Sequence, residues 1–160
     1  PDLLMNGSLI FDAKIRNATK EYAYLANLTT DKIGSIFPGE EYSVTPKIDI
    51  AINFDDELIA THNHRSHMPF NYKDFKVIFK NTNLSVKYLV VHTPTDVFIC
   101  DLEPNAKYYC EEIIDEINTC YGGGLLEVGS ENIIAANKVW GRYKSNKVLN
   151  KYMSFRRIRK

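Results

Sequence analysis

The sequence has no net charge and no long apolar run, and each absence argues against a class of protein. Twenty basic residues balance twenty acidic ones, so the overall charge does not point to nucleic acid, a membrane surface or an acidic partner. No run of about 18 apolar residues is present, and the first residues lack the charged-then-apolar layout of a signal peptide. We therefore expect a soluble protein with no membrane association.

Cysteine is scarce. Cys100, Cys110 and Cys120 cannot all pair with one another, and no Cys-x-x-Cys sequence occurs. A disulfide framework and a cysteine-based zinc knuckle are therefore not indicated. We predict a reducing compartment, either the cytoplasm or a target cytoplasm into which the domain is delivered. The expectation of delivery into a target cytoplasm reflects the first residue, Pro1, because a domain cut from a longer polypeptide would begin without Met.

The chain is long enough for one substantial core. With 160 residues, 44% of them hydrophobic, it can bury about two-thirds of its unfolded surface, so we predict a single domain over residues 1–160. Between residues 132 and 160 every charged side chain is basic. We interpret this segment as a solvated helix face followed by a basic end, and a nucleic-acid-binding surface remains the alternative.

Residue periodicity predicts an α/β fold. Alternation and β-branched or aromatic residues predict strands over residues 20–28, 33–37, 57–64, 86–92 and 97–102. Helical spacing predicts helices within 8–18, over 71–79, over 108–121 before Gly122, and after a capping Ser130. This order predicts a mixed β-sheet flanked by helices. Residues 1–18 would form a helical lead-in, and residues 130–160 a basic C-terminal helix and tail.

A candidate metal site follows the predicted strand at residues 57–64. Side chains alternate along a strand, so His62 and His64 point to one face with Cα atoms about 6 to 7 Å apart. A helix that starts near Asn71 would place Asp74, in its first turn, over the end of that strand. Two nitrogens and one oxygen would leave an open fourth position on a zinc ion, as a catalytic site requires. The alternative is a chance His-x-His beside an ordinary helix cap.

The run from Thr61 to Asp74 resembles the motif of the JAMM zinc metallopeptidases, also called the MPN or JAB-domain family. That motif is written His-x-His-Pro, then several residues, then Ser-x-x-Asp. Here the ending Pro-Phe-Asn-Tyr-Lys-Asp (69–74) is similar to the Pro-Phe-Ser-x-x-Asp of bacterial and phage versions. The preceding Leu-Ile-Ala-Thr-His-Asn-His (58–64) resembles the strand that enters the site in RadC-like members, and a looser resemblance spans residues 21–102.

The resemblance implies a zinc ion held by His62, His64 and Asp74 in the cytidine-deaminase-like architecture of that family. It also implies a general acid and base on an earlier strand, for which Glu21 is the matching position. Glu40 and Glu41 are the competitors. The position of Glu57, about 16 Å before His62 on the same strand and on the opposite face, argues against it as the base.

Two residues depart from the family motif. Arg65 stands where the family has a proline, and Asn71 stands where it has a serine or threonine. The resemblance implies that a hydroxyl at this position stabilises an oxyanion, and the Asn71 amide can donate the same hydrogen bond. Arg65 and His67 are candidate substrate contacts, and we expect His92 to be a packed core residue.

Two functions follow from the resemblance. The first is zinc-dependent hydrolysis of a peptide or isopeptide bond in a protein substrate, such as a ubiquitin-like conjugate, by a bacterial or phage type of enzyme. The resemblance to toxin-associated JAB versions implies other protein substrates as a further expectation. The second is an inactive scaffold or a RadC-like, DNA-associated binding domain, for which the basic C-terminal residues would supply the nucleic-acid contact.

Overall fold

A mixed β-sheet of seven strands forms the centre of the computed structural model, which describes residues 2–41, 44, 47–80, 84–122 and 133–160. The strand order is β2-β1-β4-β5-β6-β7, and β3 also pairs with β1. The strands are β1 (Tyr22–Asn27), β2 (Lys32–Ile33), β3 (Phe37–Pro38), β4 (Glu57–Asn63), β5 (Ser85–His92), β6 (Asp96–Leu102) and β7 (Met153–Arg159). Only β4 and β5 are parallel; every other pair of the described strands is antiparallel.

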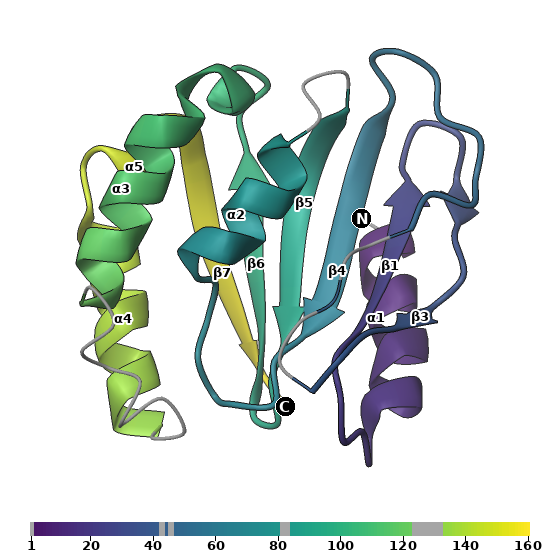
Figure 1. Cartoon of the computed structure of the whole chain (residues 1–160), viewed down its shortest axis with the longest axis horizontal. Helices are drawn as coiled ribbons and strands as arrows, with labels where there is room; N and C mark the ends of the chain where they lie inside the picture. The colour runs from purple at the N-terminus through teal and green to yellow at the C-terminus, as the bar shows by residue number, and fades with distance from the viewer. Residues whose placement is uncertain (1, 42–43, 45–46, 81–83, 123–132) are drawn as a thin grey trace.

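Helices cover both faces of the sheet, which confirms the predicted α/β class (Figure 1). One face carries α1 (Asp2–Ile15). The other carries α2 (Tyr72–Phe79), α3 (Cys110–Tyr121), α4 (Ile133–Ser145) and the short α5 (Leu149–Tyr152), with a 3₁₀ turn at Ala106–Tyr109 before α3. Gly122 ends α3 with a left-handed φ of 93°, as its position after the helical pattern predicted. Among the described residues, no helix is long and apolar enough to cross a membrane.

The parallel pair β4–β5 determines where a site can form. Parallel neighbours need a crossover, and α2 lies in the one that joins them. The carboxyl end of β4 at Asn63 and the amino end of α2 at Tyr72 therefore lie at the same edge of the sheet. Ligand sites in α/β proteins form at such edges.

Two apolar clusters hold the layers together. Phe70, Phe75 and Trp140 belong to the cluster between the sheet and α2–α5, whereas Phe11 and Tyr24 belong to the cluster under α1. Each fully buried side chain of this size contributes about 1.5–3 kcal/mol through the hydrophobic effect. Trp140 is buried in the core.

The C-terminal segment differs from the prediction. Residues 153–159 are not a basic tail, because they form β7 and pair with the whole of β6 from Leu102↔Met153 to Asp96↔Arg159. The arginines in this segment obscure the alternation of apolar and polar residues that is typical of a strand. Met153 and Phe155 nevertheless pack in the apolar cluster between the sheet and α2–α5. Arg157 pairs with the buried Asp96 over 2.8 Å, so that charge belongs to the fold.

Two further elements differ from their predicted bounds, and one predicted helix cap lies outside the residues that the structure describes. The predicted strand at residues 33–37 is two short strands, β2 and β3, and the N-terminal helix starts at Asp2 and packs on the sheet. Ser130, the predicted cap of the last helix, lies outside the described residues.

Two helical glycines give a matched test of how closely α1 packs on the sheet. A Cβ added at Gly7 would lie 2.5 Å from the Tyr24 hydroxyl oxygen, and Tyr24 is buried, whereas a Cβ at Gly141 in α4 would meet nothing within 4 Å. Gly141→Ala should raise the free energy of unfolding by about 0.5–1 kcal/mol through helix propensity. Gly7→Ala should lower it, because overpacking costs about 1–3 kcal/mol. Urea unfolding measures both, and equal stabilisation by the two changes would contradict this packing.

Candidate metal centre

Two imidazoles meet at the carboxyl end of β4. His62 lies in the strand and His64 follows it, and their Nε2 atoms are 3.1 Å apart. The pairing with β5 continues past Asn63, because the His64 N–H donates to the His92 carbonyl oxygen over 2.8 Å. Alternate side chains of an extended segment share a face, so both rings point to the same side. The sequence prediction that His62 and His64 lie together is therefore confirmed.

Asp74 approaches the two rings from the first turn of α2. Its Oδ1 lies 2.9 Å from His62 Nε2, and its Oδ2 lies 3.2 Å from His64 Nε2. The helix starts here because the Asn71 side-chain oxygen accepts the Lys73 and Asp74 N–H groups, and Asp74 Oδ2 accepts the Asn71 N–H in return. The cap that was an alternative to a metal site is thus present, and it positions Asp74 beside the rings.

The three side chains fit a metal ion in chemistry and in spacing. Their candidate ligand atoms lie within 4.8 Å of one another, and the closest separations are 2.9, 3.1 and 3.2 Å. A tetrahedron with zinc–ligand bonds of about 2.0 Å has edges of about 3.3 Å. Two imidazoles and a carboxylate also form the donor set of known catalytic zinc sites.

The tautomer of His64 suits a ligand role. His64 Nδ1 lies 2.9 Å from the Met68 carbonyl oxygen, which can only accept a hydrogen bond. Nδ1 therefore carries the proton, and Nε2 of the neutral ring keeps its lone pair for a metal. Metal-bound histidines are oriented in the same way by carbonyl or carboxylate partners.

The neighbouring charges and hydrogen bonds strongly perturb the protonation of His64 and Asp74. Burial opposes a charge on Asp74, but the charges and hydrogen bonds of His62 and His64 outweigh it and hold the pKa of Asp74 well below its usual value. Burial likewise opposes protonation of His64, yet the carboxylates of Asp74 and Glu21 and the hydrogen bonds raise its pKa to about 9. A proton thus occupies at neutral pH the place that a metal would take.

Glu21 lies directly before β1, beside this cluster. Only 7% of its surface is exposed, and burial raises its pKa above the usual value although the charges of His64 and His62 act in the opposite direction. Buried carboxylates with raised pKa values can both accept and return a proton near neutral pH. The competitors Glu40 and Glu41 are exposed, and Glu57 is exposed at the other end of β4.

Asn63 positions Glu21, and sequence reasoning did not identify it. Its side-chain oxygen accepts the Tyr22 N–H over 2.6 Å, and its NH₂ group donates to the Lys20 carbonyl oxygen over 3.4 Å. These bonds fix the backbone on both sides of Glu21 against the strand that carries the histidines. The only signal for Asn63 in the sequence was the alternation of side chains along the strand. This alternation directs the residue between His62 and His64 to the opposite face of the sheet.

The remaining candidate residues lie around the cluster. Arg65 forms an ion pair with Glu41, and His67 Nδ1 lies 3.1 Å from the Thr95 hydroxyl oxygen. Asn71 uses its side-chain oxygen in the helix cap, which leaves only its NH₂ group for the predicted oxyanion contact. The substrate roles of Arg65, His67 and Asn71 stay predictions.

His92 is a core residue, as expected. It is fully buried on the α1 side of the sheet, and its Nδ1 lies 2.9 Å from Asp12 Oδ1. Burial lowers its pKa to about 4, so the ring is neutral at pH 7. Cys100 and Cys120 are buried free thiols.

A scan against protein-family models and searches of curated proteins and of solved structures found no match to this chain. The resemblance to the JAMM family therefore stays a prediction that rests on the sequence motif.

We predict that the protein binds about one zinc ion per chain. His62→Ala, His64→Ala and Asp74→Ala should each abolish tight binding, because three ligands leave no redundancy. His67→Ala is the matched control and should retain the metal. Zinc at a hundredfold excess over its Kd should stabilise the fold by about 2.7 kcal/mol. Elemental analysis and thermal unfolding measure the two effects, and unchanged metal content in all three ligand variants would eliminate the site.

Zinc binding should release a proton at pH 7. His64 has a pKa of about 9 in the metal-free protein and must become neutral to bind, whereas Asp74 is already ionised. Affinity should therefore increase about tenfold per pH unit between pH 7 and pH 9 and level off above that range. Calorimetry in buffers of different ionisation enthalpy counts the proton. Equal heats in all buffers at pH 7 would show that His64 is not the group displaced.

Proposed function

We propose that this chain is a zinc-dependent hydrolase that cleaves a peptide or isopeptide amide bond. The observation that supports it is the convergence of His62, His64 and Asp74 with the buried carboxyl group of Glu21 at one end of β4. The JAMM resemblance of residues 61–74 suggests the same reaction. A protein or peptide substrate, such as a ubiquitin-like conjugate, is the proposed partner, and the cytoplasm the proposed site of action.

Each side chain has a separate role in the proposed reaction. A zinc ion held by His62, His64 and Asp74 would supply a Lewis acid that activates water and polarises the substrate carbonyl. Glu21 accepts the proton of the attacking water and passes it to the leaving amine, so the products are a carboxylic acid and an amine. The NH₂ group of Asn71 would donate to the developing oxyanion.

The alternative, a scaffold or DNA-associated domain, has less support. Two of the basic C-terminal side chains are engaged within the fold, since Arg157 pairs with Asp96 and Lys160 pairs with Asp12. A raised pKa on a buried acid beside candidate metal ligands is also typical of catalytic rather than scaffold sites. Salt-sensitive DNA binding that survives His62→Ala would favour the alternative.

Glu21→Gln should separate catalysis from metal binding. The change keeps the shape of the side chain and removes the proton acceptor, so zinc should stay bound while turnover falls by about 10² to 10⁴. Turnover is measured on fluorogenic peptide amides and on isopeptide-linked ubiquitin-like conjugates.

Glu57→Gln and Glu40→Gln are the controls, because both side chains are exposed. Substitutions of exposed residues typically change the free energy of unfolding by no more than about 0.5 kcal/mol. A loss of turnover in Glu40→Gln alone would assign the base to Glu40. Undiminished turnover in Glu21→Gln would remove Glu21 from the mechanism.

A further inference from the structure

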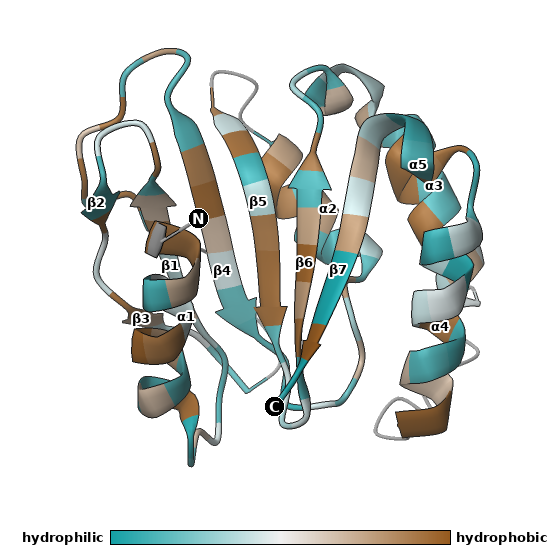
Figure 2. Ribbon diagram, turned by 180° about the vertical axis from the view of Figure 1, so that it is seen from behind, coloured by the Kyte–Doolittle hydropathy of each residue, from teal (hydrophilic) through white to brown (hydrophobic). Residues whose placement is uncertain are grey.

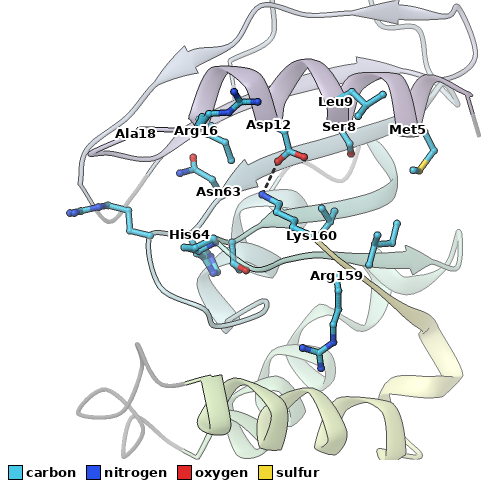
Figure 3. A pocket seen from close by; sticks show the side chains of 16 residues that line it. Met5, Ser8, Leu9, Asp12, Arg16, Ala18, Asn63, His64, Arg159 and Lys160 are labelled. Atoms are coloured by element: carbon cyan, nitrogen blue, oxygen red, sulfur yellow. Dashed lines mark ion pairs between the residues drawn. The ribbon is translucent and has the colours of Figure 1, made fainter.

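A cavity of about 600 Å³ adjoins the candidate metal centre and has no role in the proposed chemistry. It lies between α1 and the ends of β6 and β7, and both Asn63 and His64 line it (Figure 3). Its volume is within the range of about 300–1,000 Å³ that is typical of ligand sites. His64 belongs both to the cavity lining and to the candidate ligand set, so the cavity and the candidate metal centre meet at this residue.

The sheet leaves room for this cavity because its α1 face is only half covered. Figure 2 shows α1 beside β1 and β4, with no helix of the described residues in front of β6 and β7. Val97 and Ile158 on those strands line the cavity from the sheet side. A polypeptide segment placed here would cover apolar surface that no described helix covers.

The wall that α1 provides is apolar and exposed. Met5 and Leu9 are one helical turn apart, with 44% and 68% of their surfaces exposed, and both line the cavity. Exposed apolar side chains that line a concave surface are typical of a binding site rather than of a solvated helix face. The adjacent Ile10 is 55% exposed but does not line the cavity.

The charges around the cavity are mostly of one sign, although the whole chain is neutral. Arg16, Arg65, Arg159 and Lys160 line it together with the acidic Asp12. Arg65 pairs with Glu41 and Lys160 pairs with Asp12, so Arg16 and Arg159 supply the positive charge that these pairs do not neutralise. The Asp12 carboxylate is already engaged, 2.7 Å from Lys160 Nζ and 2.9 Å from His92 Nδ1. Within the described part of the chain, no acidic side chain pairs with Arg16. The cavity therefore favours an anionic occupant.

We infer that this cavity binds an acidic segment of the peptide substrate that also carries large apolar side chains. Such a segment would place its apolar side chains against Met5, Leu9 and Ile158 and its carboxylates near Arg16. The apolar wall disfavours a sugar-phosphate backbone, which requires polar contacts along its length. The inference rests on the proposed function for the identity of the substrate, but binding itself needs no hydrolysis.

The test is direct binding to the zinc-loaded Glu21→Gln protein, measured by fluorescence anisotropy. The probes are fluorescein-labelled octapeptides of alternating Leu and Glu, of alternating Leu and Lys, and of alternating Ser and Glu. The Leu/Glu peptide should bind at least about tenfold more tightly than either of the others, because it alone combines both chemistries. Its affinity should fall with added salt.

Two pairs of substitutions on α1 locate the binding. Arg16→Glu should weaken the Leu/Glu peptide about tenfold and strengthen the Leu/Lys peptide, whereas Lys14→Glu, two residues away and outside the cavity lining, should change neither. Leu9→Gln should weaken the Leu/Glu peptide about tenfold, and Ile10→Gln should not. All four residues are exposed, so each variant should fold.

Each outcome has a distinct meaning. Equal binding of the three peptides, or a preference that Arg16→Glu and Leu9→Gln leave unchanged, would overturn the inference even if the enzyme is active. Full displacement of the Leu/Glu peptide by an equimolar amount of dodecanoate would reassign the cavity to a lipid-like anion and also overturn it. Peptide binding in a protein that hydrolyses nothing would support the cavity and remove the proposed function.

Discussion

Asp74 brings a carboxylate into a site from which water is largely removed, and the two imidazoles beside it determine how that charge is held. A buried ion is costly unless partners compensate it, and here His62 and His64 do so. The compensation requires at least one proton or one cation among the three groups. This requirement relates the local fold to function, because a divalent metal satisfies the same three groups without the proton on His64.

Much of the surrounding structure serves to keep these groups in place. The Asn71 cap orients Asp74, the Met68 carbonyl orients His64, and the Tyr143 hydroxyl donates to the Phe70 carbonyl oxygen over 2.5 Å to anchor the intervening loop to α4. Tyr143 is itself fully buried in the main apolar cluster. Core packing is therefore coupled to the position of the candidate ligands, which is the support that preorganised sites need.

The sheet separates two environments that meet at one edge. The face toward α2 carries the candidate metal centre, and the face toward α1 carries the Asp12–His92 pair and the basic cavity. Asn63 and His64 join them, since Asn63 fixes the backbone around Glu21 and also lines the cavity. The cavity on one face and the candidate metal centre on the other are thus connected through two adjacent residues, the last of β4 and the one that follows it.

The sequence alone determined the three candidate ligands, the strand that presents His62 and His64, and the helix start that presents Asp74, because these depend on periods of two and on a local cap. It also identified β4, β5 and β6, where apolar runs are strong. Only the tertiary structure decided that residues 153–159 join the sheet, since pairing with β6 and the Arg157–Asp96 contact outweigh a basic composition. The burial of Glu21, its alignment by Asn63, and the cavity between α1 and β7 were likewise decided by contacts between residues distant in sequence, which no local pattern encodes.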